Sequence, residues 1–191
     1  MAGQIGPRRV VSREHVVRGA CRYFLLYGTV DMDPLAEHLA ISRATLYRVV
    51  HSRDALLADV LWRLGERLLM RARRQRSRGG VDGVIEVTRH FTGSLRRSRA
   101  FRAFLSGEPE TAARVLFIAP DGVHRRVVRM QKDILIEADD AREWSPDNLD
   151  QLAFLYVRIV ESALYAELLN CLRIDGDLAE RAARAVLRPA G

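Results

Sequence analysis

Residues 42–48 place several side chains that can donate to phosphates and base edges on one short segment. The segment reads Ser-Arg-Ala-Thr-Leu-Tyr-Arg, and its serine stands where a helix N-cap is needed. The side chains that such a helix exposes belong to Arg43, Thr45, Tyr47 and Arg48. A guanidinium can fork onto a guanine, and a threonine methyl group can touch a thymine. These residue types favour recognition of duplex DNA over catalysis.

The place of each residue within the segment decides whether we expect it to contact a base edge or a phosphate. Arg43 and Thr45 lie at its N-terminal end, nearest the base edges, whereas Tyr47 and Arg48 are better placed for phosphates. The alternative is that these are only solvated charges on a helix surface. The residues expected at DNA are Ser42, Arg43, Ala44, Thr45, Tyr47, Arg48 and, at the start of the following helix, Arg53.

Two short helices with a tight turn between them must position these side chains. Apolar residues recur at helical spacing through this part of the chain and would pack one helix across the other. They are Leu35, Ala36, Leu39, Ile41, Leu46 and Val50. Asp31 and Ser52 stand at the expected N-caps of the flanking helices. The pattern is that of a helix-turn-helix, whose second helix enters the major groove.

The remainder of the chain also has helical periodicity, so we expect an all-α fold. A first helix should run from about Ser12 to Leu26 and stop at Gly28, and a fourth should run from Ser52 to about Gln75. Gly79-Gly80 marks the most probable domain boundary in the pattern. Beyond it, helices are expected at about 81–97, 99–106, 109–117, 122–142, 147–172 and 176–187. We therefore divide the chain into a basic arm and helix-turn-helix domain at 1–54, a connecting helix at 53–78 and a helical domain at 79–191.

The charge distribution agrees with this division. Residues 1–78 contain 15 arginines and 7 acidic residues, a net charge of +8. Residues 79–191 contain 16 basic and 17 acidic residues, a net charge of −1. A basic module joined to a nearly neutral one is typical of a DNA-binding head attached to a body that does not bind DNA.

The sequence contains no motif typical of an enzyme, a metalloprotein or a membrane protein. The sequence contains no nucleophile elbow, phosphate loop, zinc-protease motif or dinucleotide fingerprint, so we expect no enzyme, no catalytic residues and no cofactor. Without clustered His or a CxxC pair, no metal site is expected. Cys21 and Cys171 are expected to be buried free thiols of a cytoplasmic, nucleoid-associated protein. No apolar run is long enough to span a bilayer, and no secretory signal is recognisable at the N-terminus.

The helical domain should provide a ligand cavity and a dimer face. The stretch from Leu149 to Leu172 is apolar nearly all round, so it must be covered on every side, by its own domain and by a ligand cavity or a second subunit. Arg158 and Glu161 interrupt it and could pair with each other, lie on the dimer face or face a ligand. The candidate pocket residues are Phe91, Phe101, Phe104, Phe117, Met130, Ile134, Phe154, Arg158 and Tyr165. The candidate dimer residues, which with the last helix suggest half of an intersubunit bundle, are Leu152, Tyr156, Ile159, Leu178, Ala182 and Val186.

The first 60 or so residues resemble the TetR family of one-component bacterial regulators. The resemblance is carried by an aromatic-x-x-x-Gly turn ending at Gly28, an Ile-Ser turn followed by Leu46-Tyr47, and the helix start Ser52-Arg-Asp-Ala-Leu-Leu57. Two positions depart from the family pattern, because Ala40 replaces the usual turn glycine and Val49-Val50 replace the usual His-Phe. The tail, including residues 154–163, is similar to the QsdR type, whose members respond to lactone signals.

The resemblance implies a homodimer whose two heads read a pseudo-palindromic operator in double-stranded DNA. Tyr47 matches the family's phosphate-contacting tyrosine. The function expected is that of a repressor released by a mostly apolar small molecule, such as a lactone or acyl compound, without a membrane partner. A constitutive DNA-binding protein and a helical enzyme are the alternatives.

Overall fold

The computed structural model describes residues 11–119, 122–139, 144, 148–170, 172 and 174–188, with the side chains of 167–170 left out. Within this part of the chain every regular element is a helix, so the fold is all-α as expected. The helices are α1 (Arg13–Tyr27), α2 (Met32–His38), α3 (Arg43–Val50), α4 (Arg53–Gln75), α5 (Gly80–Arg97), α6 (Arg99–Gly107), α7 (Pro109–Ala113), the π-helix η1 (Arg114–Ile118), α8 (Val123–Ala138), α9 (Leu149–Asn170) and α10 (Gly176–Leu187).

The helix boundaries expected from the sequence agree closely with these. The expected helix at 109–117 is divided between α7 and η1, because the i→i+5 pattern begins at Arg114. The helix expected at 122–142 ends at Ala138, and residues 140–142 lie outside the described part. The basic arm at 1–10 and Cys171 also lie outside it, whereas Cys21 is buried as expected.

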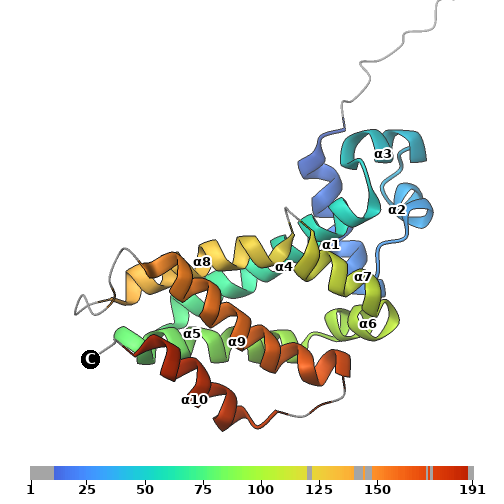
Figure 1. Cartoon of the computed structure of the whole chain (residues 1–191). Coiled ribbons are helices and arrows are strands. Elements are labelled where there is room, and N and C mark those ends of the chain that lie inside the picture. The colour runs from blue at the N-terminus through green and yellow to red at the C-terminus, as the bar shows by residue number, and fades with distance from the viewer. Residues whose placement is uncertain are drawn as a thin grey trace, which may run out of the picture.

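Helices α1, α2 and α3 form a small head at one end of the molecule (Figure 1). Val16 and Ala20 of α1 pack with Leu35 of α2 and with Leu46 and Val50 of α3, and all five are fully buried. The local signals work as the sequence indicates, since the hydroxyl groups of Ser12, Ser42 and Ser52 each accept a backbone N–H bond from the residue three positions on. Asp31 takes the N-cap backbone conformation without a side-chain bond.

The body consists of α5 to α10, and α4 connects it to the head (Figure 1). Helix α4 packs against α1 in the head and against α5 and α8 in the body, while α9 lies between α8 and α10. The larger buried cluster runs from α1 through α4 into α6 and η1, whereas a second cluster joins α5, α8, α9 and α10. Head and body therefore share a continuous apolar core. No described helix is both long and apolar enough to cross a membrane.

The turn after α1 brings head and body into close contact. Gly28 ends α1 in the left-handed conformation, with φ of 72°. A Cβ atom at this position would lie 2.8 Å from the Ala103 Cβ atom and 3.2 Å from the Ala100 carbonyl oxygen, both in α6. Beside this contact, Phe24 of α1 meets Phe104 of α6 edge-on, with ring centroids 5.7 Å apart. The end of α1 thus rests directly on α6.

The turn between α2 and α3 contains a strained residue. Ala40, which replaces the glycine usual in the family pattern, has φ of +52°. A left-handed alanine costs about 1–2 kcal/mol, and a glycine there would remove that cost while losing about 0.4–1 kcal/mol to greater freedom of the unfolded chain.

We expect Ala40→Gly to raise the midpoint of thermal unfolding, measured by circular dichroism, by about 1–3 °C. Ala44→Gly is the matched control, since Ala44 lies within α3 and a glycine inside a helix costs about 1 kcal/mol. The two substitutions should shift the midpoint in opposite directions. A lower midpoint for Ala40→Gly would show that the strain is compensated elsewhere in the turn.

Candidate DNA-binding surface and ligand cavity

Helix α3 has one buried face and one exposed face. Leu46 and Val50 are buried against the head, whereas Ser42, Arg43, Ala44 and Arg48 are exposed and Thr45 and Tyr47 are half-buried. At the start of α3, the Ser42 hydroxyl group accepts from the Thr45 backbone N–H at 3.1 Å and lies 2.9 Å from the Thr45 hydroxyl oxygen. The fold therefore presents six of the seven residues expected at DNA on or beside one short helix.

The guanidinium group of Arg43 is held by partners that DNA can replace. Its Nε atom lies 3.0 Å from a carboxylate oxygen of Asp33, and its carbon Cζ lies 5.5 Å from the centre of the Tyr47 ring. Both members of the ion pair are well exposed, and such pairs contribute only about 0–1 kcal/mol. Arg43 can therefore exchange Asp33 for a base edge or phosphate at little cost.

Arg53, the seventh residue expected at DNA, lies at the junction of head and body, and its contact with DNA stays a prediction. Its guanidinium donates to the Val30 carbonyl oxygen at 2.7 Å, to the Thr29 hydroxyl at 3.1 Å and to the Glu108 carboxylate at 2.7 Å. The hydrogen bond from Arg53 lowers the pKa of Glu108, so the pair stays ionised at neutral pH. Through its Nε and Nη2 groups, Arg53 connects α4 with the start of α7. Its position in sequence did not reveal the distant glutamate.

A second connection joins the head to α8 through Asp59 of α4. The Asp59 carboxylate binds Arg13 of α1 at 2.7 Å and Arg126 of α8 at 3.1 Å, one arginine to each oxygen. Arg13 also donates to the carbonyl oxygen of Val49, in the last turn of α3. One carboxylate therefore connects a body helix, the connecting helix and the end of the helix that carries the DNA-facing residues.

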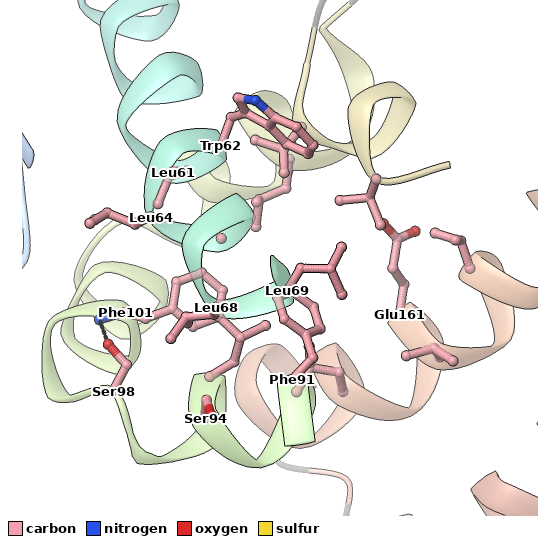
Figure 2. Close-up of a pocket in the computed structure, with 18 of the residues that line it drawn as sticks. Leu61, Trp62, Leu64, Leu68, Leu69, Phe91, Ser94, Ser98, Phe101 and Glu161 are labelled. Atoms are coloured by element: carbon pink, nitrogen blue, oxygen red, sulfur yellow. Dashed lines mark hydrogen bonds between the residues drawn. The ribbon is translucent and has the colours of Figure 1, made fainter. Parts of the chain in front are cut away.

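A partly open cavity of about 370 Å³ lies beside α4, between the body and the end of α1. Its wall comes from α1, α4, α5, α6, η1, α8 and α9, and it is predominantly apolar. In Figure 2, Phe101 and Ser98 of α6 stand on one side of the view and Glu161 of α9 on the other, with Leu68, Leu69 and Phe91 between them. The volume falls within the range of about 300–1,000 Å³ found for small-molecule pockets.

Three of the expected pocket residues line this cavity, namely Phe91, Phe101 and Tyr165. The other six do not, and each has a different environment. Phe104 packs on Phe24, Phe117 packs against Tyr165, and Ile134 belongs to the second core cluster. The Met130 sulfur accepts a hydrogen bond from Arg73. Phe154 and Arg158 are half exposed.

The reason for the error in α9 is its orientation. The helix turns Tyr156, Val157, Val160, Glu161, Leu164 and Tyr165 toward the cavity. Phe154 and Arg158 lie on the same side of α9 as Glu161 but contact residues outside the wall, since Phe154 meets His124 edge-on and Arg158 lies over the ring of Phe117. A helix that is apolar nearly all round carries no periodic signal of which face turns inward.

Polar groups occur at separate points of the wall. The hydroxyl oxygens of Thr88 and Tyr156 lie 2.6 Å apart and satisfy each other. Burial raises the pKa of the Glu161 carboxyl group, while its contacts with His124 at 3.0 Å and Arg158 at 3.3 Å act in the opposite direction. Arg158 and Glu161 thus pair with each other, and Glu161 also lines the cavity. Gln131 of α8 is buried in the wall as well.

A shallow apolar groove runs along the outside of the body between α9 and α10. Three of the expected dimer residues lie in it, namely Ile159, Leu178 and Ala182, together with Leu155, Ala163 and Ile174. Leu155 and Leu178 are each 53% exposed. Tyr156 is corrected, because it is only 1% exposed and belongs to the cavity wall. Leu152 packs against the second core, and Val186 is half-buried on α10.

The sequence reasoning missed several residues of the cavity wall. Trp62 lies on α4, which the sequence presents only as a connector, and Thr88 and Gln131 are isolated polar residues within helical patterns. A single amide in a helix is most often exposed, so its type and position offered no signal. Gln131 is buried where α8 packs against the neighbouring helices α4, α5 and α9.

Comparison with known proteins shows which family and which solved structure this chain is similar to. The profile of the family "Tetracyclin repressor-like, C-terminal domain" matches residues 79–188. Among solved structures, that of the Rhodococcus (R. erythropolis) transcriptional repressor QsdR from the TetR family is similar, with 28% sequence identity and a TM-score of 0.82. The similarity covers 92% of this chain and 93% of that one. No curated protein is close enough in sequence to count as a match.

Proposed function

The chain belongs to the TetR family of transcriptional regulators, and from this we propose that it is a ligand-responsive repressor that binds a pseudo-palindromic operator as a homodimer. Two features together carry the proposal: an exposed, arginine-bearing α3, and a partly open apolar cavity beside α4, the helix that joins the head to the body. Repression is proposed because the similar QsdR is a transcriptional repressor.

We place DNA recognition on α3 and on the charge of the first domain. The net charge of +8 over residues 1–78 would attract the phosphate backbone regardless of sequence. Arg43 and Thr45, in the first turn of α3, would then contact base edges, and Tyr47 and Arg48 would contact phosphates. Two heads related by a twofold axis would read two half-sites about one helical repeat apart.

We place dimerisation on the groove between α9 and α10. Its exposed leucines and small residues permit close approach of a second copy, and a twofold interface would use the same surface from both subunits. The two copies of α9 and α10 would then form a four-helix bundle.

Ligand binding would change the spacing of the heads through α4 and α6. Leu61, Trp62 and Leu68 of α4 and Phe101 of α6 all line the cavity, and both helices contact α1. Asp59 and Glu108 fasten the head to the body beside these helices. A ligand acts only by its difference in affinity between the two head spacings, so it must bind the DNA-incompetent spacing more tightly.

The test is recovery of genomic DNA bound by the purified protein, followed by gel-shift assays on the enriched fragment. We expect a retarded band with an inverted repeat in the protected sequence, released by a mostly apolar small molecule such as a lactone or acyl compound. A scrambled fragment of equal length is the control. Failure to enrich any fragment would contradict the proposal, and an enriched operator that no compound releases would leave a constitutive DNA-binding protein.

A further inference from the structure

Helix α4 lacks a side chain at one point of the cavity wall. Gly65 lies in the middle of this 23-residue helix and lines the cavity. A Cβ atom built on Gly65 would meet no atom within 4 Å beyond the neighbouring backbone of α4. Within the described part of the chain, Gly65 is the one glycine in a helix interior of which this is true. The position beside Gly65 is therefore open space.

Packing within the fold does not account for this glycine. Glycine in a helix interior is destabilising relative to alanine, and an alanine would fit at this position. Two other interior glycines do have a steric reason, since a Cβ atom at Gly19 would clash with the Leu39 side chain and one at Gly83 with the Arg78 carbonyl oxygen. The space at Gly65 instead belongs to the cavity, where a ligand can occupy it.

Apolar side chains surround the gap on the same face of α4. Residues three and four positions before and after a helical residue share its face. Here all four line the cavity, and they are Leu61, Trp62, Leu68 and Leu69. Figure 2 shows the first two one helical stretch away from the last two along α4. We call the space between these four side chains the Gly65 notch, and its hydrocarbon walls favour an apolar group over a charged one.

We infer that an apolar chain of the ligand lies in the Gly65 notch, where it takes the place of the missing side chain and packs on the backbone of α4. Gly65 is then a specificity-determining residue, because the absence of its side chain sets the length of chain that the cavity accepts. The inference rests on the proposed ligand-responsive function and identifies the part of the ligand that touches the helix joining head and body.

The test uses two uncharged probes that differ in chain length, hexan-1-ol and decan-1-ol. Calorimetry and the fluorescence of Trp62, which lies beside the notch, follow their binding. We expect the wild-type protein to bind decan-1-ol roughly tenfold or more tightly than hexan-1-ol, because more methylene groups are buried. Gly65→Leu places a four-carbon side chain in the notch, so it should weaken decan-1-ol binding roughly tenfold or more and hexan-1-ol binding by less than about threefold.

Gly65→Ala separates a role in ligand binding from a role in the fold. It should raise the midpoint of thermal unfolding by about 2–4 °C, because alanine is the better helix former. The added methyl group should nevertheless weaken decan-1-ol binding about threefold. A glycine that the helix needs for bending or close packing would lower the midpoint when replaced, and that result would overturn the inference.

Gly107→Ala and Gly107→Leu are the matched controls. Gly107 is the last residue of α6, it lies outside the cavity wall, and a Cβ atom there would also meet nothing within 4 Å. Both controls should bind the two alcohols as the wild-type protein does. Equal weakening by the Gly65 and Gly107 variants would show a general effect of the substitutions and would contradict the inference.

The outcomes separate this inference from the function on which it rests. If the alcohols bind wild-type protein and Gly65→Leu equally well, the chain does not lie in the Gly65 notch, while the cavity remains a ligand site. If neither alcohol binds the wild-type protein, the inference is also wrong, and the proposed function is then judged by operator release alone. Circular dichroism checks the fold of each variant, and Gly65→Ala decides the question should Gly65→Leu not fold.

Discussion

Leu178→Glu is expected to convert the protein from a dimer into a monomer and to weaken operator binding by about two to four orders of magnitude. Leu178 is 53% exposed in the groove between α9 and α10, so the fold of a single chain loses little when it is replaced. In a twofold interface the substitution removes two leucines, one from each subunit, and burial of each leucine stabilises the dimer by about 1.5–3 kcal/mol. A monomer also loses the high effective concentration of the second head at the second half-site.

The measurement pairs sedimentation equilibrium with a gel shift on the operator. Leu26→Glu is the matched control, because Leu26 is also an exposed leucine but lies on α1, outside the groove. The control should remain dimeric and should retain specific binding. If Leu178→Glu stays dimeric, or if its monomer binds the operator as tightly as the wild-type protein, the interface has been placed on the wrong surface.

Arg43→Ala is expected to reduce operator affinity by about 5- to 150-fold for each half-site, which corresponds to about 1–3 kcal/mol for one bidentate contact with a base. Affinity for unrelated duplex DNA should fall much less, since one charge among the 15 arginines of residues 1–78 is lost. The stability of the fold should hardly change, because the ion pair between Arg43 and Asp33 is exposed.

Fluorescence anisotropy on the operator and on a scrambled duplex, at one fixed salt concentration, measures both affinities. Arg125→Ala provides the control, because Arg125 is an exposed arginine on α8, far along the chain from α3. This control removes the same charge and should leave the ratio of the two affinities unchanged. Equal losses on both duplexes for Arg43→Ala would show that Arg43 contacts phosphates only.

The helices and their ends could be predicted from the sequence because their signals are local. A serine before a helical run accepts a backbone N–H three residues later, and Ser12, Ser42 and Ser52 all do so in the structure. Gly28 likewise takes the left-handed conformation that ends α1. These contacts span at most a few residues, so residue type and spacing determine them. The exposed residues of α3 followed from the same local periodicity.

The cavity and the connections between head and body could not be predicted in this way, because they depend on partners far apart in the chain. Arg53 reaches Glu108, 55 positions away, and nothing near Arg53 in sequence reveals that carboxylate. Tyr156 and Phe154 are neighbours in an apolar run, yet one is buried in the cavity wall and the other is half exposed. The rotation of α9 about its axis decides between them, and that rotation is set by the packing of α8 and α10.

Because Gly28 touches α6, the affinity of a compound for the cavity and its effect on the position of the head can differ. The nine-residue helix α6 turns Phe101 toward the cavity and Ala100 and Ala103 toward the end of α1, with no room left between them. Under the proposed function, a compound that shifts α6 by pushing on Phe101 would also shift the end of α1, whereas one that fits beside an unmoved Phe101 would leave the head where it was. Two molecules of equal affinity can for this reason differ completely in effect, one an inducer and the other a silent competitor that blocks induction.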